Sequence, residues 1–294
     1  MTTGKFISLK PRTSTAVDLQ RMEISHGAMR VQYDLDLNAP SQRFIYDCCQ
    51  GGGVYEALTT NLLTRVLKPG DAFIDVGAHV GFFSMIAAAL VGPAGRVVAF
   101  EPNAENYASL RNNVSLNGYA HVVCVNSAAG DRDGEVKFFE NLDNDGGHAL
   151  WDPGLHSFNE KSKARQTTRR LPIATLDTDL SGLGVQSIKA VKIDTEGAEV
   201  QVLRGGARCL AAPGIELLVC EDNEFGLASL GTSGTELRRA LEKLGFVVCV
   251  QDAQGALRQI DANTPLESAS VDNFYCLRRN SQDQFNALWL ALSR

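Results

Sequence analysis

Several features that mark membrane and secreted proteins are missing from this 294-residue sequence. Its longest apolar run, from Gly81 to Val91, is far shorter than the roughly 20 residues that a membrane-spanning helix needs. The first residues, MTTGKFISLKPRT, lack the apolar stretch of a signal peptide. We therefore expect a cytoplasmic protein with no membrane partner.

Cysteine pairs and an excess of basic residues, which mark two other classes of protein, are missing as well. The seven cysteines include no CxxC pair and no zinc-ligand spacing, so we expect reduced, buried thiols. Lys and Arg number 28 against 34 Asp and Glu, which predicts no broad basic surface for nucleic acid. The expected partner is a small-molecule substrate. The oligomeric state stays open, with a homodimer as one option.

What the sequence does contain is a regular alternation of apolar strands and amphipathic helices. In a chain with 44% hydrophobic residues, this alternation predicts an α/β fold, a mostly parallel sheet with helices on both faces. The last two strands have no helix between them, so we expect them to form a hairpin at one edge. The expected strands are 72–76, 96–101, 121–126, 188–194, 215–221, 246–250 and 273–278, and the expected helices are 55–67, 81–91, 103–117, 199–210 and 232–245.

Two segments stand outside this alternation. Residues 1–53 are irregular and polar and end in three glycines, so we interpret them as an N-terminal cap on a main domain of residues 54–294. Inside that domain, residues 135–176 begin and end like strands, but their glycine-rich, charged middle is too long for an ordinary connection. We expect about 141–170 to form a lid. Its basic stretch, 161–170, is a candidate to hold an anionic group, although such runs are more often solvated.

The turn DVGAHVG, from Asp75 to Gly81, follows the first strand of the alternation, where ligands bind in parallel sheets. Its glycines allow close backbone approach, but an acid before them repels a pyrophosphate and suits an ammonium group. Glu101 ends the next strand, where a carboxylate can accept hydrogen bonds from both hydroxyls of a ribose. Together these features indicate S-adenosylmethionine; a nicotinamide cofactor, or a purely structural role for the acids, is the alternative. The expected cofactor contacts are Tyr55, Asp75, Gly77, Ala78, His79, Gly81, Phe82, Glu101, Pro102, Asn103, Asn126, Ser127, Ala128 and Asp194.

Three stretches carry a resemblance to a known family: KPGDAFIDVGAHVGFFSMIAA, FEPNAENYASLRNNVSLN and VKIDTEGAEVQVLRGG. Over roughly residues 52–225 the chain resembles the FkbM family of S-adenosylmethionine-dependent methyltransferases. The resemblance implies the class I methyltransferase fold, which is Rossmann-like, with a seven-stranded sheet whose last strand is antiparallel. It also implies O-methylation of a hydroxyl on a sugar or a glycosylated secondary metabolite.

Four acids at the ends of two later strands are the catalytic candidates. Asp194 and Glu196 follow one strand, and Glu221 and Asp222 follow the other. Because parallel strands end at the same edge of a sheet, we expect Asp194, Glu221 and Asp222 to converge near the transferred methyl group. One carboxylate would act as a general base, or a hard cation such as Mg²⁺ would bind between them. We favour the metal-free base, with Asp194 as that residue.

Alternatives remain open for several residues and for the function. Glu199 is expected to pack or cap a helix, and the loop histidines His148 and His156 are candidate bases, although lone loop histidines are more often solvated. The acceptor could instead be a carboxylate or an amine, or the protein could bind S-adenosylmethionine without catalysis. An NAD-dependent oxidoreductase is the least favoured function, because GxGxxG is missing and an acid precedes the first glycine.

Overall fold

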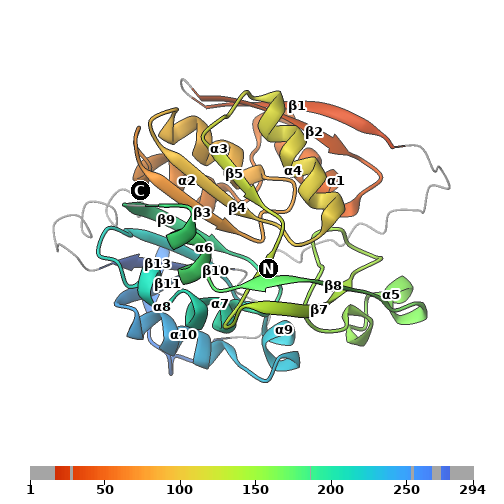
Figure 1. Ribbon diagram of the computed structural model, residues 1–294, viewed down its shortest axis with the longest axis vertical. Helices are drawn as coiled ribbons and strands as arrows, with labels where there is room; N and C mark the ends of the chain where they lie inside the picture. The colour runs from red at the N-terminus through yellow and green to blue at the C-terminus, as the bar shows by residue number, and fades with distance from the viewer. Residues whose placement is uncertain (1–16, 27–28, 186, 253–254, 267–272, 279–294) are drawn as a thin grey trace.

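The computed structural model describes residues 17–26, 29–185, 187–252, 255–266 and 273–278. Its centre is an eight-stranded sheet with the strand order β12-β11-β13-β10-β9-β3-β4-β5 (Figure 1). The five strands from β10 to β5 run parallel. The eight strands of the sheet are β3 (Ala72–Val76), β4 (Arg96–Phe100), β5 (Val122–Val125), β9 (Ile188–Ile193), β10 (Leu217–Glu221), β11 (Phe246–Gln251), β12 (Leu257–Ile260) and β13 (Asn273–Arg278).

The last strand, β13, corrects one sequence prediction. It pairs antiparallel with β11, as predicted, but it also pairs antiparallel with β10 and therefore lies inside the sheet. The edge is formed by β12, an eighth strand that the sequence analysis does not predict. Burial explains the order, since Phe274 and Cys276 of β13 are fully buried whereas β12 exposes Arg258 and Gln259. Charged and polar side chains suit the open edge of a sheet.

Helices cover both faces of the sheet, because successive strand residues point to opposite sides and both sides are apolar. Phe73 packs in one hydrophobic cluster and its neighbour Ile74 in the other. The first face carries α2 (Ala57–Val66), α3 (Phe82–Val91) and α4 (Ala104–Leu116), and the second carries α6 (Leu176–Gly182), α7 (Glu199–Gly205), α8 (Ala207–Leu210) and α10 (Gly234–Lys243). The predicted helix 199–210 is thus two short helices, α7 and α8.

The described part of the predicted N-terminal cap contains regular structure. It forms an antiparallel hairpin of β1 (Leu19–His26) and β2 (Met29–Asp36), followed by α1 (Pro40–Cys49) and the short η1 (Gln50–Gly52). The hairpin lies over α3 and α4 (Figure 1). Tyr33 is fully buried and donates a hydrogen bond to the carbonyl of Phe82, and Asn113 accepts one from the backbone of Asp34. The hairpin therefore shares the hydrophobic core of the first face.

The insertion of residues 135–176 begins and ends in strands, as predicted. β7 (Gly134–Glu140) and β8 (Thr167–Ala174) pair antiparallel and form a three-stranded sheet with β6 (Ala128–Ala129). Between them lie η2 (Pro153–Leu155) and α5 (Glu160–Ala164). One further helix, α9 (Glu224–Ser229), follows β10.

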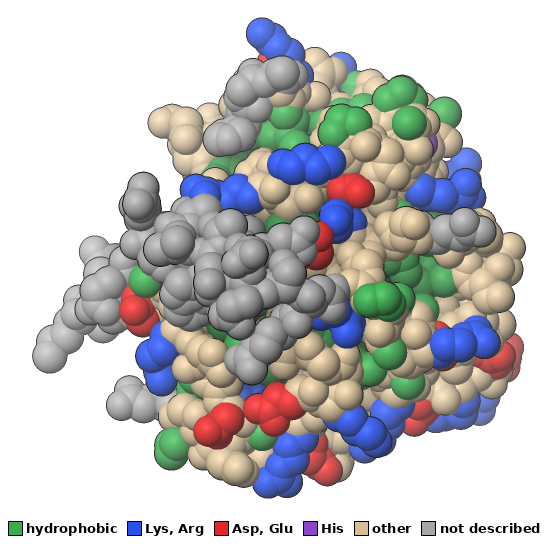
Figure 2. Space-filling model, turned by 90° about the vertical axis from the view of Figure 1, so that its left-hand side faces the viewer, with side chains coloured by type: hydrophobic (Ala, Val, Ile, Leu, Met, Phe, Trp, Pro, Cys, Tyr) green, Lys and Arg blue, Asp and Glu red, His purple; other side chains and the backbone are tan. Residues whose placement is uncertain are grey.

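On the face shown in Figure 2, basic and acidic side chains are mixed around the atoms drawn in grey. Among the described residues, every helix is too short or too polar to cross a membrane.

Candidate active site

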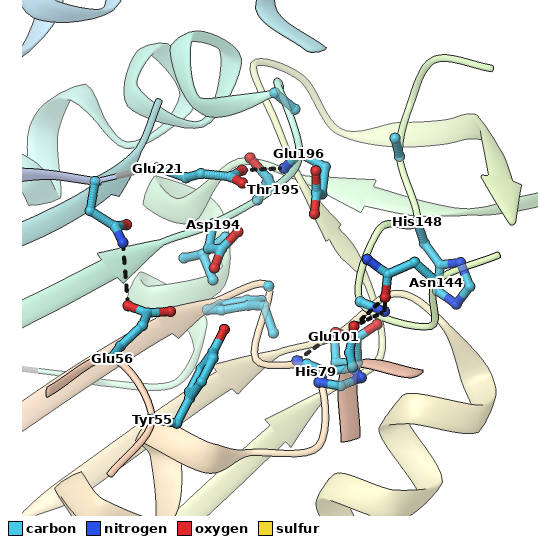
Figure 3. Close-up of a pocket in the computed structure, with 18 of the residues that line it drawn as sticks. Tyr55, Glu56, His79, Glu101, Asn144, His148, Asp194, Thr195, Glu196 and Glu221 are labelled. Carbon is cyan, nitrogen blue, oxygen red and sulfur yellow. Dashed lines mark hydrogen bonds between the residues drawn. The ribbon is translucent and has the colours of Figure 1, made fainter. Parts of the chain in front are cut away.

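A cavity of about 1110 Å³ opens at the carboxyl ends of β3, β4, β9 and β10. This is where the strand order reverses, since the chain leaves β3 for β4 on one side and reaches β9 and β10 on the other. Figure 3 shows Asp194, Glu196 and Glu221 on one side of this region and His79 and Glu101 on the other. Of the residues predicted to bind cofactor or to act in catalysis, the cavity is lined by Tyr55, Gly77, His79, Glu101, Pro102, Ser127, Ala128, Asp194, Glu196 and Glu221.

The turn after β3 is held between two other strands. The backbone N–H groups of Gly77 and Ala78 both donate to the carbonyl of Phe100, at 3.0 and 2.9 Å. Gly77 has φ +81°, and a Cβ atom on it would lie 1.7 Å from the carbonyl oxygen of Asp194. Only glycine fits at this position, which brings the turn close to the catalytic candidate Asp194.

We predict that Gly77→Ala unfolds far more easily than wild type. Left-handed strain and the clash with the Asp194 carbonyl should lower the free energy of unfolding by roughly 3 kcal/mol or more. Urea denaturation measures the difference. The matched control is Gly182→Ala, where an added Cβ meets nothing within 4 Å and no left-handed φ is present. Equal stability of the two variants would contradict the prediction.

Asp75 lies behind the turn rather than in the cavity. Its side chain is buried and accepts a 2.6 Å hydrogen bond from the hydroxyl of Ser84 in α3. Burial raises the pKa of Asp75 to about 6, although the charge of Lys192 acts in the opposite direction. The structure therefore gives Asp75 a role in holding the turn to α3. Ala78, Gly81 and Phe82 likewise support the turn from outside the cavity.

Backbone hydrogen bonds hold the side chain of Glu101 in position. Its two carboxylate oxygens accept 2.8 Å hydrogen bonds from the N–H groups of His79 and Asn103, one each. Burial raises the pKa of this carboxyl to about 7, although the nearby His79 acts to lower it. A buried carboxylate fixed on two sides and open to the cavity is suited to accept hydrogen bonds from a ligand's hydroxyl groups.

The remaining predicted cofactor residues divide into two groups. Pro102, Ser127 and Ala128 line the cavity beside Glu101. Asn103 instead caps α4, where its side chain accepts from the N–H groups of Glu105 and Asn106. Asn126 is exposed, and its amide donates to the carbonyls of Glu101 and Pro102. Both asparagines thus shape the backbone around the cavity without lining it.

Three carboxylates converge on the opposite side of the cavity. One oxygen from each of Asp194, Glu196 and Glu221 lies within 4.8 Å of the others. The predicted convergence is therefore present, but Glu196 takes the place expected for Asp222, which lies outside the cavity lining. The reason is local: Asp222 follows the last residue of β10 and points toward Gly234 of α10.

Hydrogen bonds and burial give these carboxylates different properties. The Glu196 N–H donates to Glu221 at 3.1 Å, and Asn223 donates to the Glu196 carboxylate at 2.6 Å. Burial, with repulsion from Asp194, raises the pKa of Glu196 to about 8. Burial, with repulsion from Glu196, raises the pKa of Glu221 well above its usual value. Glu199 packs as predicted, accepting three hydrogen bonds from Thr195 and Gly197.

Lys192 is an important neighbour that the sequence analysis missed. Its ammonium group is buried and lies 2.5 Å from a carboxylate oxygen of Asp194. Burial alone would lower the pKa of Lys192, but the charges of Asp194 and Glu56 raise it well above its usual range. The signal was available, since a lysine inside the apolar strand AVKI needs a buried partner.

The predicted lid supplies part of the cavity wall. Its residues Asn144, Gly146, His148, Ala149 and Leu150 line the cavity. The basic residues at 161–170 lie outside the lining, on α5, on β8 and on the short link between them, and Arg169 of β8 pairs with Glu140. The structure therefore does not support a role for this basic stretch in gripping a ligand inside the cavity.

Comparisons with known proteins identify related sequences. The profile of the methyltransferase FkbM domain matches residues 75–248, more than half of the chain. The AMB antimetabolite synthetase AmbE of Pseudomonas aeruginosa is 27% identical over 216 residues, which cover 64% of this chain and 10% of that protein. This chain thus spans about a tenth of the length of that curated relative.

Solved structures of two methyltransferases align with part of this chain. A crystal structure of methyltransferase FkbM from Methylobacillus flagellatus aligns with a TM-score of 0.42 at 14% identity, covering 74% of this chain and 50% of that one. An S-adenosylmethionine-dependent O-methyltransferase from Thermotoga maritima aligns with a TM-score of 0.40 at 14% identity, covering 87% and 77%. By its sequence match over residues 75–248, the chain belongs to the FkbM family of S-adenosylmethionine-dependent methyltransferases.

Proposed function

We propose that this methyltransferase transfers a methyl group to a hydroxyl oxygen of a small, carbohydrate-like metabolite. The observation that carries the proposal is the convergence of Asp194, Glu196 and Glu221 in the cavity. A hydroxyl is a weak nucleophile that gains from a base, and carboxylates with raised pKa can serve as one. The name of the relative AmbE, a synthetase of an antimetabolite, adds support for a specialised metabolite as acceptor.

We assign each part of S-adenosylmethionine to one part of the cavity. Glu101 accepts hydrogen bonds from the ribose hydroxyls, and the adenine lies beside Pro102, Ser127 and Ala128. The methionine end lies along the turn at Gly77, whose backbone can approach a ligand closely. The sulfonium then faces the carboxylates at the ends of β9 and β10.

The reaction is an in-line displacement. The acceptor oxygen attacks the methyl carbon while the carbon–sulfur bond breaks, and the sulfur keeps the electron pair and becomes neutral. The proton of the hydroxyl passes to a carboxylate. The protein contributes chiefly by placing the oxygen close to the methyl group and by excluding water.

The contacts of the carboxylates change which one we propose as the general base. Sequence reasoning favours Asp194 as the base, but a carboxylate oxygen of Asp194 is already held by the buried ammonium of Lys192. Burial and repulsion from Glu196 raise the pKa of Glu221, which suits its carboxylate to accept a proton. We therefore assign the base to Glu221, with Asp194 and Lys192 as a pair that orders the end of β9.

The metal-free reading predicts that methyl transfer survives exhaustive dialysis against EDTA. Asp194, Glu196 and Glu221 could also surround a divalent cation, but the Lys192 ammonium already occupies an oxygen of Asp194. Turnover of dialysed enzyme, measured as S-adenosylhomocysteine formed, should stay within about twofold of the untreated enzyme, since no metal contributes to lowering the hydroxyl pKa. Loss of activity that Mg²⁺ restores would contradict this reading.

The acceptor class is tested by locating the methyl group in the product. Glycosylated metabolites are offered with matched amines and carboxylic acids, and transfer from isotopically labelled S-adenosylmethionine is followed by NMR. The proposal requires label on a hydroxyl oxygen. Label on nitrogen or on a carboxylate would favour the alternative acceptors, and cofactor binding without transfer to any class would favour the non-catalytic alternative.

The insertion is proposed to select the acceptor. Trp151 donates a 2.6 Å hydrogen bond to the carbonyl of Glu196, and its ring packs against Phe225 of α9. Leu150 lines the cavity next to it. Through these contacts the middle of the insertion lies against the loop that carries Glu196, where it can contact the acceptor.

A further inference from the structure

The first part of the insertion, residues 141–150, contacts the turn after β3, which runs from Asp75 to Gly81. Asp145 pairs with the ring Nε2 of His79 at 2.8 Å, and the backbone N–H of His79 donates to Glu101 at 2.8 Å. In Figure 3, Asn144 and His148 lie on the same side of the site as His79 and Glu101. This part of the insertion therefore stands beside the carboxylate assigned to the ribose, away from the carboxylates that surround the methyl group.

This part of the insertion is held firmly. The Asp145 carboxylate accepts a 2.7 Å hydrogen bond from the N–H of Ser41 in α1, and its carbonyl accepts one from Asn106 of α4 at 2.8 Å. Burial alone would raise the pKa of Asp145, but these contacts and His79 lower it overall. Ala149 exchanges two backbone hydrogen bonds with Phe139 of β7. The backbone on both sides of His148 is thus fixed.

His148 has a defined protonation state. Its Nδ1 accepts a 2.9 Å hydrogen bond from the backbone N–H of Asn141, so Nδ1 carries no proton. Burial lowers the pKa of His148 to about 4, which keeps the ring neutral at physiological pH. In a neutral imidazole the other nitrogen carries the hydrogen. Nε2 is therefore a hydrogen-bond donor, and within the described part of the chain it has no protein partner.

The ring of His148 is also oriented by packing. The buried Phe138 of β7 meets it edge to face, with 5.9 Å between ring centroids, and both residues line the cavity. Because His148 is only partly buried and lines the cavity, its free donor is available to a ligand that fills the cavity. The nucleoside part of the cofactor offers such acceptors in its adenine ring nitrogens and ribose oxygens.

We propose that His148 is a cofactor-binding residue whose Nε2–H donates a hydrogen bond to the nucleoside part of S-adenosylmethionine. The inference rests on the cofactor placement in the proposed function and is independent of the methyl acceptor. It gives the insertion two roles, with residues 141–150 completing the nucleoside site and the following residues facing the acceptor.

Calorimetric titration with two probes, S-adenosylhomocysteine and methylthioadenosine, tests this contact. Methylthioadenosine keeps the nucleoside but lacks the amino-acid part. His148→Phe removes the donor and keeps an aromatic ring, and it should weaken both probes about tenfold, or about 1.4 kcal/mol. His148→Gln, whose amide can donate from a similar position, should recover most of the loss. The matched control is His156→Phe, in the same insertion but outside the cavity lining, which should bind both probes like wild type.

Several outcomes would overturn the proposal. Wild-type affinity in His148→Phe would show that no such hydrogen bond exists, and equal weakening in the Phe and Gln variants would show a packing role only. A loss seen with S-adenosylhomocysteine but not with methylthioadenosine would move the contact to the amino-acid part. If wild type bound neither probe, the proposed cofactor site itself would be wrong. Failure of the His148 contact alone would instead leave the binding of both probes to wild type intact.

Discussion

Replacing Glu101 with glutamine should weaken the binding of S-adenosylmethionine by about 100-fold. The ionised carboxylate is held by the N–H groups of His79 and Asn103 and faces the cavity, where it would accept two hydrogen bonds from the ribose. Hydrogen bonds to a charged group contribute about 1.5–3 kcal/mol each, and about 1.4 kcal/mol is a factor of ten in affinity. Calorimetry on both proteins measures the change.

The matched control for this variant is Glu105→Gln. Glu105 lies in the first turn of α4 close in sequence to Glu101 but outside the cavity lining, so its replacement should leave affinity within about twofold of wild type, the scale of a surface change. Equal binding by wild type and Glu101→Gln would remove Glu101 from the cofactor site.

The affinity of wild type should also depend on pH through Glu101. Burial raises the pKa of this carboxyl to about 7 in the free protein, so the carboxylate is ionised above pH 7 and protonated below it. The ribose hydroxyls bind the ionised form better, so affinity should fall as the pH decreases through 7. The profile of Glu101→Gln should lack this step.

Replacing Glu221 with glutamine should lower kcat by about 10²–10⁴, the usual contribution of a general base. Glutamine keeps the shape of the side chain and can still accept the hydrogen bond from the Glu196 N–H, but it cannot take a proton. Steady-state kinetics at saturating cofactor, with S-adenosylhomocysteine as the measured product, separates this loss from a binding effect.

Asp222→Asn is the matched control for Glu221→Gln. Asp222 is the next residue in the chain but lies outside the cavity lining, so this variant should keep kcat within about threefold, the scale of a change that touches no reacting group. A large loss in Asp222→Asn with near-normal turnover in Glu221→Gln would reverse the assignment. Loss confined to Asp194→Asn would restore Asp194 as the base, as sequence reasoning favours.

The pH profile of kcat gives a second test of the base. A base must be ionised to accept a proton, and burial together with repulsion from Glu196 raises the pKa of Glu221 well above its usual value. Turnover should therefore rise with increasing pH as Glu221 ionises, and the positive sulfonium should move this rise to lower pH by favouring the ionised carboxylate. The rise should be absent in Glu221→Gln.

Much of the central sheet and of the cofactor turn could be predicted from the sequence because these signals are local. Alternating strands and helices encode a parallel sheet, and parallel strands place their carboxyl ends at one edge. Asp194, Glu221 and Glu101 could therefore be assigned to one site from their positions at strand ends. Gly77 could be recognised as well, since a turn from strand to helix at this point needs a left-handed residue.

The structure was needed wherever the answer depends on which way a side chain points or on pairing between distant segments. Asp75 and Asp222 both follow the strand pattern, yet one is buried against Ser84 and the other lies outside the cavity lining. The interior position of β13 depends on its pairing with both β10 and β11, and no local signal encodes that order.

By itself the sequence determined the fold class, the family and the edge of the sheet that carries the site. Hydrophobic periodicity and the residues at strand ends are local signals, so each can be recognised within a short stretch of chain. Only the tertiary structure decided which carboxylates meet, that Lys192 pairs with Asp194, that Asp145 pairs with His79, and that His148 lines the cavity. The physical reason is distance along the chain. His79 and Asp145 are 66 residues apart, and a contact of that kind exists only after the insertion has folded back over the turn.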